Sequence, residues 1–338
     1  MATMRAWQYT SAAGGLENNL FLPATGAPKP RVGDNEVLVE IFSMALNPAD
    51  YKYPELGLVA KAMVPSPAIP GMDYCGKVVD VGSKVDAYKL GQLVFGAKTG
   101  AVGHGSLAQF IAVPEEMVAL VPEGTSVDDA ASVSGVGVTG CLAIQPYVKK
   151  GDRVFINGGS GGTGILGIQI AKALGCHVTT SCSEANMDLC RGIGADEVID
   201  YKTRDIIKTL QEKSEAFDHV VDNVGIPANL YKVSHNFLKP TGTFVQVGVG
   251  SGMGDAAQLV GNLLQPGFLG GGKRKYKFIM ASASSDHLSQ LAAWMKEGKI
   301  RAVIDSVFEF DDAPKAFEKL KTGRAKGKIV VHVKKEQD

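Results

Sequence analysis

The stretch that decides the fold is Arg153-Val154-Phe155-Ile156-Asn157, which runs directly into Gly158-Gly159-Ser160-Gly161-Gly162-Thr163-Gly164. The first five residues read as a buried strand, and the apolar residues from Ile165 to Leu174 predict a helix after the glycines. Glycines let backbone N–H groups approach phosphate oxygens closely, and the start of a helix adds partial positive charge. The order of strand, turn and helix therefore predicts a dinucleotide site with these contacts: Gly158, Gly159, Ser160, Gly161, Gly162 and Thr163.

The glycine spacing differs from the usual dinucleotide fingerprint. Gly159, Gly162 and Gly164 form G-x-x-G-x-G, whereas the fingerprint is G-x-G-x-x-G. A turn that binds no ligand is the alternative interpretation. The prediction of a dinucleotide site therefore depends on the strand before the glycines and the helix after them.

Apolar strands alternate with helical segments on both sides of this turn. Strands are predicted at 153–157, 177–180, 197–199, 219–221 and 244–248, with helices at 165–174 and through Leu189. Such alternation builds a parallel sheet with helices on both faces, which is a doubly wound α/β fold.

The first third of the chain has a different character. Short β-branched segments at 36–41, 77–81 and 90–96 predict a mainly β unit, and Pro65, Pro67 and Pro70 exclude a helix before Gly71. Ser126 is a predicted helix N-cap. Strands at 301–305 and 328–333 end the chain, and periodicity alone leaves open which unit they join.

The end of the second predicted strand bears on the choice of cofactor. An NAD site places Asp or Glu there, about 20 residues after the glycines. This chain has Thr180-Ser181-Cys182-Ser183, whose neutral hydroxyls leave room for a 2′-phosphate, although Glu184 argues the other way. We therefore expect NADPH, with these 2′-phosphate and ribose contacts: Ser181, Ser183, Asn186 and Tyr201.

Length, composition and charge indicate which classes of partner the protein can bind. The length of 338 residues suggests two domains, 45% of the residues are hydrophobic, and 35 basic residues balance 35 acidic ones. Zero net charge disfavours nucleic acid and anionic membranes, so we expect a small-molecule substrate. The sequence lacks a secretory start and an apolar run of the roughly 18 residues that span a bilayer, so we expect a cytoplasmic protein with its five cysteines reduced.

Several separated blocks resemble the medium-chain dehydrogenase/reductase superfamily, and within it the zinc-free quinone oxidoreductase and enone (enoyl) reductase branch. The likeness covers nearly the whole chain. The blocks that carry it are Leu46 to Lys52, Pro70 to Gly76, Val79 to Gly82, the glycine turn with Gln169 to Lys172, Gly194 to Tyr201, and Gly327 to Val331.

The resemblance implies a GroES-like β domain with a Rossmann domain inserted into it. The expected boundaries are 1–127 and 276–338 for the GroES-like domain and 128–275 for the Rossmann domain. It also implies an active site in the cleft between the domains, and a homodimer.

The resemblance further implies that this chain holds no metal. Zinc members use a cysteine, a Gly-His-Glu block and a four-cysteine lobe, whereas this chain has Gly71-Met72-Asp73 and no cysteine between Cys75 and Cys141. The six histidines are isolated, which also speaks against a metal site.

Without zinc, hydrogen-bond donors must stabilise the charge that develops on a substrate carbonyl oxygen during hydride transfer. By resemblance, Asn47 and Lys52 supply them and Thr139 lies beside the cofactor, while Tyr51, Tyr53 or water gives the proton. A turn at Asn47-Pro48, a packed Tyr51 and a solvated Lys52 are the structural alternatives. Further cofactor contacts are expected from the ends of parallel strands and from the tail: Asn223, Val224, Val247, Gly248 and Lys328.

These observations predict an NADPH-dependent reductase of quinones or α,β-unsaturated carbonyls. Simple carbonyl reduction by a carbonyl reductase or alcohol dehydrogenase is the alternative among enzymes, and a nucleotide-binding structural or regulatory protein is the alternative outside them. The glycine-rich region from Gly248 to Gly272 suggests a mobile lid near the cleft, whereas the basic cluster of Arg274, Lys275 and Lys277 is typical of a solvated surface.

Overall fold

The computed structural model describes residues 2–57, 62, 64–100, 103–214, 216–248, 253–265, 267 and 271–334. The chain divides into two compact units, the first made of Met1–Val138 and Ser282–Asp338 and the second of Thr139–Ala281. The first unit is therefore assembled from both ends of the chain, with the second inserted between them.

The first unit is built on a seven-stranded sheet of order β14-β15-β3-β4-β5-β7, in which β6 also pairs with β3. Its long central strand, β3, alternates β-branched and other apolar residues, which suits a pleated and largely buried surface. The strands are β3 Glu36–Leu46, β4 Asp73–Val81, β5 Leu93–Ala97, β6 Phe110–Pro114, β7 Val118–Leu120, β14 Ile304–Glu309 and β15 Lys328–His332. A separate ribbon pairs β1 Thr3–Met4 with β2 Ala27–Pro28.

The last strand of the chain joins this first sheet. Strand β15 lies antiparallel to β3, with Ile329 opposite Leu46 and His332 opposite Ser43, and it pairs in parallel with β14 on its other side. The expected strand at 301–305 instead covers Ile304–Glu309. The tail thus completes the GroES-like domain, and it brings Lys328 beside the end of β3.

Helix α10 of the first unit packs on its apolar core. Phe317 of α10 is fully buried there with Ile41, Ile329 and Val331. The helices of this unit include α1 Pro48–Lys52, α9 Ser285–Lys296 and α10 Ala313–Lys321, with α3 Val127–Ile144 crossing the division between the units.

The second unit contains a six-stranded sheet of order β10-β9-β8-β11-β12-β13, and every pairing in it is parallel. In chain order this is 3-2-1-4-5-6, the doubly wound Rossmann arrangement, so the predicted fold class is confirmed. The strands are β8 Arg153–Asn157, β9 His177–Cys182, β10 Glu197–Asp200, β11 Phe217–Asp222, β12 Leu238–Gln246 and β13 Lys275–Phe278. The strand order reverses between β8 and β11. In open parallel sheets, ligands bind at such a reversal, outside the carboxyl ends of the strands.

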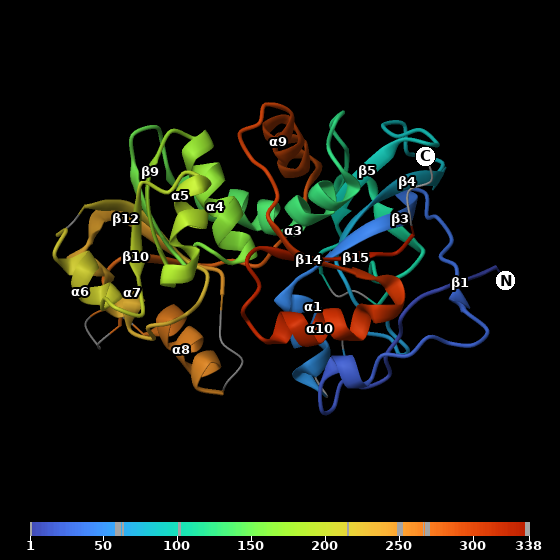
Figure 1. Cartoon of the computed structure of the whole chain (residues 1–338), viewed down its shortest axis with the longest axis horizontal. Helices are drawn as coiled ribbons and strands as arrows, with labels where there is room; N and C mark the ends of the chain where they lie inside the picture. The colour runs from blue at the N-terminus through green and yellow to red at the C-terminus, as the bar shows by residue number, and fades with distance from the viewer. Residues whose placement is uncertain are drawn as a thin grey trace. The chain divides into compact units, whose positions relative to one another are not determined.

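The helices of the second unit connect its strands, as the green to orange part of the chain in Figure 1 shows. Helix α4 packs against β8 and β9, and α8 packs near β13. Phe155, Phe217 and Phe244 form the buried centre of one side of the sheet. The helices are α4 Gly162–Ala173, α5 Met187–Gly192, α6 Ile206–Gln211, α7 Leu230–Val233 and α8 Met253–Leu264.

One expectation needs correction in this unit, and a strand that the sequence analysis did not predict is present. Much of the region from Gly248 to Gly272, predicted as a mobile loop, is the helix α8 Met253–Leu264, because its glycines lie mainly at its ends. Residues 249–252, 266 and 268–270 of the proposed lid lie outside the described residues. Lys275 and Lys277 are exposed, as expected of a solvated surface, and they belong to the unpredicted strand β13, in which they alternate with the less exposed Tyr276 and Phe278.

The structure also differs from the expected boundaries at 127/128 and 275/276. Helix α3 continues without a break through Val138, where the compact units divide, and β13 is part of the Rossmann sheet. Within the described part of the chain, the stretch Val127–Tyr147 is long and apolar enough to cross a membrane. Since 78% of its most apolar window is buried inside the protein, it has the character of a core helix.

Candidate functional site

The glycine turn after β8 follows the path that the sequence predicts, and three of its glycines are required by the protein's own packing. Gly158 has a φ of 81°, which other residues rarely adopt. A Cβ on Gly159 would lie 2.1 Å from Oγ1 of Thr180, and one on Gly164 would lie 2.1 Å from the carbonyl oxygen of Gly158. These contacts let α4 begin close to the sheet.

Gly161 is different, because the protein itself does not need a glycine there. A Cβ would meet only the carbonyl oxygen of Gly158 at 3.8 Å, and the backbone has φ −80° and ψ 164°. Gly161 is the N-cap of α4, and no side chain caps this helix among the residues described. The first N–H groups of a helix have no partner within the helix, so this end can bind the pyrophosphate of a dinucleotide.

Buried polar side chains hold the turn in place. The hydroxyl of Ser181 donates to Oδ1 of Asn157 at 2.6 Å and accepts from the backbone N–H of Gly158 at 3.0 Å. The side-chain amide of Asn157 donates in turn to Oδ1 of Asp222 at 2.9 Å. Ser181, expected as a cofactor contact, is thus engaged by the turn itself.

Asp222 extends this network to the end of β11. Its Oδ1 also accepts from the N–H groups of Val224 at 3.0 Å and Gly225 at 2.9 Å. Burial raises the pKa of Asp222, and the hydrogen bonds from these groups oppose the rise. Three parallel strands, β9, β8 and β11, are tied together at their carboxyl ends by these side chains.

The other expected cofactor residues fall into two groups. Asn186 and Ser160 lie together, with Nδ2 of Asn186 donating to Oγ of Ser160 at 3.0 Å, and Ser183 is half-buried between β9 and a short helical turn. Tyr201 is 52% exposed. The second group follows β11 and β12, where a Cβ on Gly248 would lie 1.8 Å from the carbonyl oxygen of Asn223, so that the two strand ends are in close contact. This group comprises Asn223, Val224, Val247 and Gly248.

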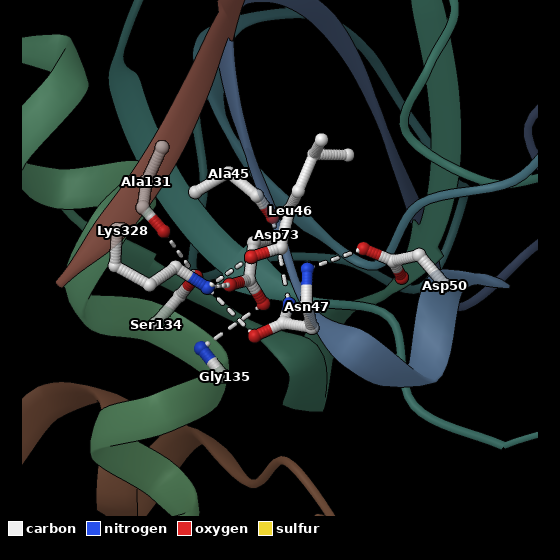
Figure 2. Close-up of polar contacts among 9 residues, drawn as sticks. All are labelled: Ala45, Leu46, Asn47, Asp50, Asp73, Ala131, Ser134, Gly135 and Lys328. Carbon is white, nitrogen blue, oxygen red and sulfur yellow. Dashed lines mark hydrogen bonds and ion pairs between the residues drawn. The ribbon is translucent and has the colours of Figure 1, made fainter. Parts of the chain in front are cut away.

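In the first unit, a buried cluster forms around the ammonium group of Lys328 (Figure 2). Nζ of Lys328 donates to the carbonyl oxygen of Leu46 at 2.9 Å, to Oδ1 of Asn47 at 2.6 Å and to Oδ2 of Asp73 at 3.0 Å. The other oxygen of Asp73 accepts from the N–H of Gly135 in α3 at 3.1 Å. An ammonium has three N–H donors. Lys328, expected among the cofactor contacts, therefore directs all three to oxygens of its own unit.

Asp50 completes this cluster from the other side of Asn47. Its Oδ2 accepts from the backbone N–H of Asn47 at 2.7 Å, while Oδ1 is buried with no hydrogen-bond partner among the described atoms. Burial raises the pKa of Asp50 to about 8, and the nearby Asp73 carboxylate adds to the rise, whereas the hydrogen bond from Asn47 and the charge of Lys328 lower the pKa. Asp50 is therefore neutral over much of the range in which most carboxyls are charged.

The remaining expected catalytic residues are placed by α1 and α3. Tyr51 packs against the apolar core with the ammonium of Lys321 5.3 Å from its ring centre, and burial raises the pKa of its hydroxyl. Lys52 is half-buried at the end of α1, and Tyr53 is 46% exposed. Thr139 is buried within α3, in the second unit.

The described residues contain no group of three His, Cys, Asp or Glu side chains that could hold a metal ion. The five cysteines are buried, and none of them forms a disulfide in the described part of the chain. Asp73 stands where zinc members have the last residue of their Gly-His-Glu block. Its Oδ2 forms an ion pair with the ammonium of Lys328.

Sequence reasoning missed Asp50, Asp73 and Asp222 as members of the two clusters. Asp50 and Asp73 lie inside the quoted family blocks, so their position could have been noticed, but their burial could not. Asp222 ends an apolar strand, and a charged residue at the carboxyl end of a parallel strand is the signal that could have found it.

Two family models match the chain, an alcohol dehydrogenase GroES-like domain at residues 33–123 and a zinc-binding dehydrogenase family at residues 193–331. A trans-enoyl reductase, pgmF, of Aspergillus terreus is 45% identical over 98% of this chain and 97% of its own length. The 2-methylene-furan-3-one reductase of Solanum lycopersicum is 34% identical over 97% of this chain and 79% of its own length. The solved quinone oxidoreductase of Coxiella burnetii is 29% identical, with a TM-score of 0.83 over 98% of this chain and all of that one.

Reductases of this kind generally use NAD(P)H, which fits the glycine turn and the uncapped start of α4. The two-unit architecture, the Rossmann strand order and the full-length similarity all indicate the same superfamily. The chain belongs to the medium-chain dehydrogenase/reductase superfamily of oxidoreductases, in the branch of the enoyl reductases and quinone oxidoreductases.

Proposed function

We propose that this protein reduces α,β-unsaturated carbonyl compounds, of the enoyl or quinone type, with NADPH and without zinc. The observation that carries the proposal is the similarity along the whole chain to a trans-enoyl reductase, at 45% identity. The relatives named as a furanone reductase and a quinone oxidoreductase support the same substrate chemistry.

The residues of the second unit fit a dinucleotide. The N–H groups of the first turn of α4 would hold the pyrophosphate, and Asn186 with Ser160 and Ser183 would hold the ribose and its 2′-phosphate. When bound, NADPH supplies a hydride, and water or a nearby hydroxyl supplies the proton that completes the reduction.

The preference for NADPH is supported by the end of β9, which carries Ser181, Cys182 and Ser183 in place of an acidic residue. The carboxylate of Asp200, which pairs with Cys182 across the sheet, is engaged by the N–H of Lys202 and the hydroxyl of Thr203. A 2′-phosphate near Ser183 would therefore meet hydroxyl and amide groups and not a free carboxylate.

The zinc-free mechanism is supported by the cluster around Lys328. Its ammonium group neutralises Asp73, so this carboxylate is occupied by a fixed cation of the protein. Asn47 and Lys52 would then stabilise the charge on the substrate's carbonyl oxygen, with Thr139 near the cofactor and Tyr51, Tyr53 or water as the proton donor.

We also propose a cytoplasmic homodimer. Strand β13 lies at the edge of the Rossmann sheet and pairs only with β12 in the described sheet. An edge strand offers unpaired backbone groups to a second copy of the chain. Light scattering on the purified protein would give the mass of a monomer if this assembly does not form.

The test is NADPH oxidation against a panel of enones, alkenals, quinones and saturated aldehydes, with NADH in parallel and zinc measured by elemental analysis. We expect turnover of the conjugated substrates, a preference for NADPH, and no stoichiometric zinc. Turnover of saturated aldehydes alone would favour the carbonyl reductase, and binding of NADPH without any turnover would favour the nucleotide-binding protein. Ser183→Asp should shift the preference toward NADH, because a carboxylate repels the 2′-phosphate.

A further inference from the structure

The contact between Lys328 and Asn47 determines which way the Asn47 amide points. An ammonium group can only donate hydrogen bonds, so the Asn47 atom that lies 2.6 Å from Nζ of Lys328 must be the acceptor, Oδ1. This contact fixes the assignment of the two amide atoms. The amide nitrogen, Nδ2, therefore faces away from Lys328.

The Nδ2 group is only weakly engaged by the protein. It reaches the carbonyl oxygen of Ala45 at 3.4 Å, which is long for a hydrogen bond, and it carries a second N–H. The backbone N–H of Asn47 is held separately by Asp50. Asn47 is thus fixed at its backbone and at its side-chain oxygen, while one of its two side-chain N–H groups has only a long contact and the other remains for another group.

We propose that Lys328, itself held by Asp73, is a positioning residue that fixes the Asn47 amide so that Nδ2 donates to the carbonyl oxygen of the substrate. This inference rests on the proposed function. It gives Lys328 a different role from cofactor binding, and it makes Asp73 and Gly135 the outer members of one chain of contacts: Gly135 to Asp73, Asp73 to Lys328, and Lys328 to Asn47.

The charge of Lys328 also changes the strength of the Asn47 donor. Lys328 and Asp73 are 3% and 0% exposed, so their field is little screened by water. As the β-carbon of an enone gains a hydride, the electron pair of the conjugated system moves onto the carbonyl oxygen, and the α-carbon later takes a proton. A donor polarised by an ammonium at its oxygen stabilises that enolate oxygen more than it stabilises the neutral ketone, which lowers the barrier.

Steady-state kinetics on four variants test this chain of contacts. Lys328→Met together with Asp73→Asn removes the positioning charge without leaving an unpaired buried ion, and Asn47→Ala removes the donor. We expect Asn47→Ala to lower kcat about 100-fold, the size typical of a lost oxyanion donor, with KM for NADPH unchanged. We expect the pair of substitutions to lower kcat about 10-fold, since a donor that is free to rotate is lost only in part. The triple variant, which combines Asn47→Ala with the pair of substitutions, completes a double-mutant cycle. Lys326→Met at an exposed site is the matched control.

The cycle separates positioning from a structural role. If Lys328 acts through Asn47, the paired substitutions change kcat less than about 2-fold once Asn47 is alanine, because no donor remains to be positioned. Independent and multiplicative losses would overturn the inference. Thermal unfolding of every variant shows whether a loss of kcat merely follows a loss of fold.

A second readout does not depend on turnover. An enone labelled at its carbonyl carbon is bound to the enzyme with NADP⁺, and the carbonyl stretching frequency is measured by infrared difference spectroscopy. We expect a lowered frequency in the natural protein that is lost in Asn47→Ala and in the paired variant. A lowered frequency that persists in Asn47→Ala overturns the inference even if enones are reduced. An enone that neither binds nor reacts refutes the proposed function itself, and the inference with it.

Discussion

The ammonium of Lys328 lies 3.0 Å from a carboxylate oxygen of Asp73, although 255 residues separate them in the chain. Their side chains are only 4% and 0% exposed. Removing two charges from water is costly, so a buried pair of this kind adds little net stability, whereas breaking it is expensive. Its position beside Asn47 explains why the fold retains it.

Replacing Lys328 alone should destabilise the protein. Lys328→Met leaves the Asp73 carboxylate buried without a counter-ion, which costs about 3 to 5 kcal/mol of unfolding free energy in comparable cases. Adding Asp73→Asn should restore most of the loss. Urea unfolding gives the values, with Lys326→Met as the control at an exposed site. An unchanged midpoint for Lys328→Met would show that the two groups are not paired in solution.

Asp50 should make the protein less stable as pH rises. Its pKa is raised from 3.8 to about 8, so between these values the folded state keeps a proton that the unfolded state has lost. The free energy of unfolding then falls with pH across this window, with a slope of at most about 1.4 kcal/mol per pH unit for one proton. Asp50→Asn removes this titration and should flatten the profile, although Asp73 and Lys328 remain beside the site.

The matched control for Asp50 is Asp86→Asn, on the exposed surface of the same unit. Urea unfolding from pH 4 to 9 should give the natural slope for that variant. Equal slopes for the Asp50 and Asp86 variants would mean that Asp50 is ionised in the folded protein.

His219 should make the protein less stable as pH falls, which is the opposite of the effect of Asp50. Burial in β11 lowers its pKa from 6.5 to about 4, and Nε2 lies 2.7 Å from the carbonyl oxygen of Ala143. Between these values the unfolded state binds a proton that the folded state does not, so stability falls as pH drops from 6.5 to 4. His219→Gln should reduce that dependence, as measured by thermal melts across the window, while the control His235→Gln, at a half-buried position, should not.

Two glycines of the turn should respond differently to alanine. Gly164→Ala places a Cβ 2.1 Å from the carbonyl oxygen of Gly158, so both folding and NADPH binding should suffer. Gly161→Ala meets only an ordinary contact at 3.8 Å, so the melting temperature should stay within about 2 °C of the natural value. Its Cβ should nonetheless obstruct the pyrophosphate and weaken NADPH binding about 10-fold or more, measured by fluorescence titration. Natural affinity in Gly161→Ala would place the phosphates elsewhere.

The sequence predicts the Rossmann unit well because its signals are local. The strand at Arg153, the glycine turn and the helix after it are adjacent in the chain, and the structure has β8 at Arg153–Asn157 as expected. Strand β13 was missed because its alternating lysines and aromatics resemble a surface cluster. Helix α8 was missed because flanking glycines dominate the composition of its region.

The polar clusters could be predicted only in part. Asn47 and Ser181 were identified as site residues, but their partners depend on contacts between distant segments. Ser181 was expected to face a cofactor and is instead bonded to Asn157, which is 24 residues earlier. The contact of Asn47 with Lys328 spans 281 residues, so only the pairing of β15 with β3 reveals it.

The pairing of β15 with β3 also has a consequence for the synthesis of the protein. Asn47 and Asp73 leave the ribosome early, and the cation that orders them is encoded in the final strand. A nascent chain already carries the complete nucleotide turn long before Lys328 is made. The buried cluster can therefore form only after translation has passed residue 328, and a product that terminates earlier has the nucleotide turn but lacks the cation that holds Asn47 and Asp73.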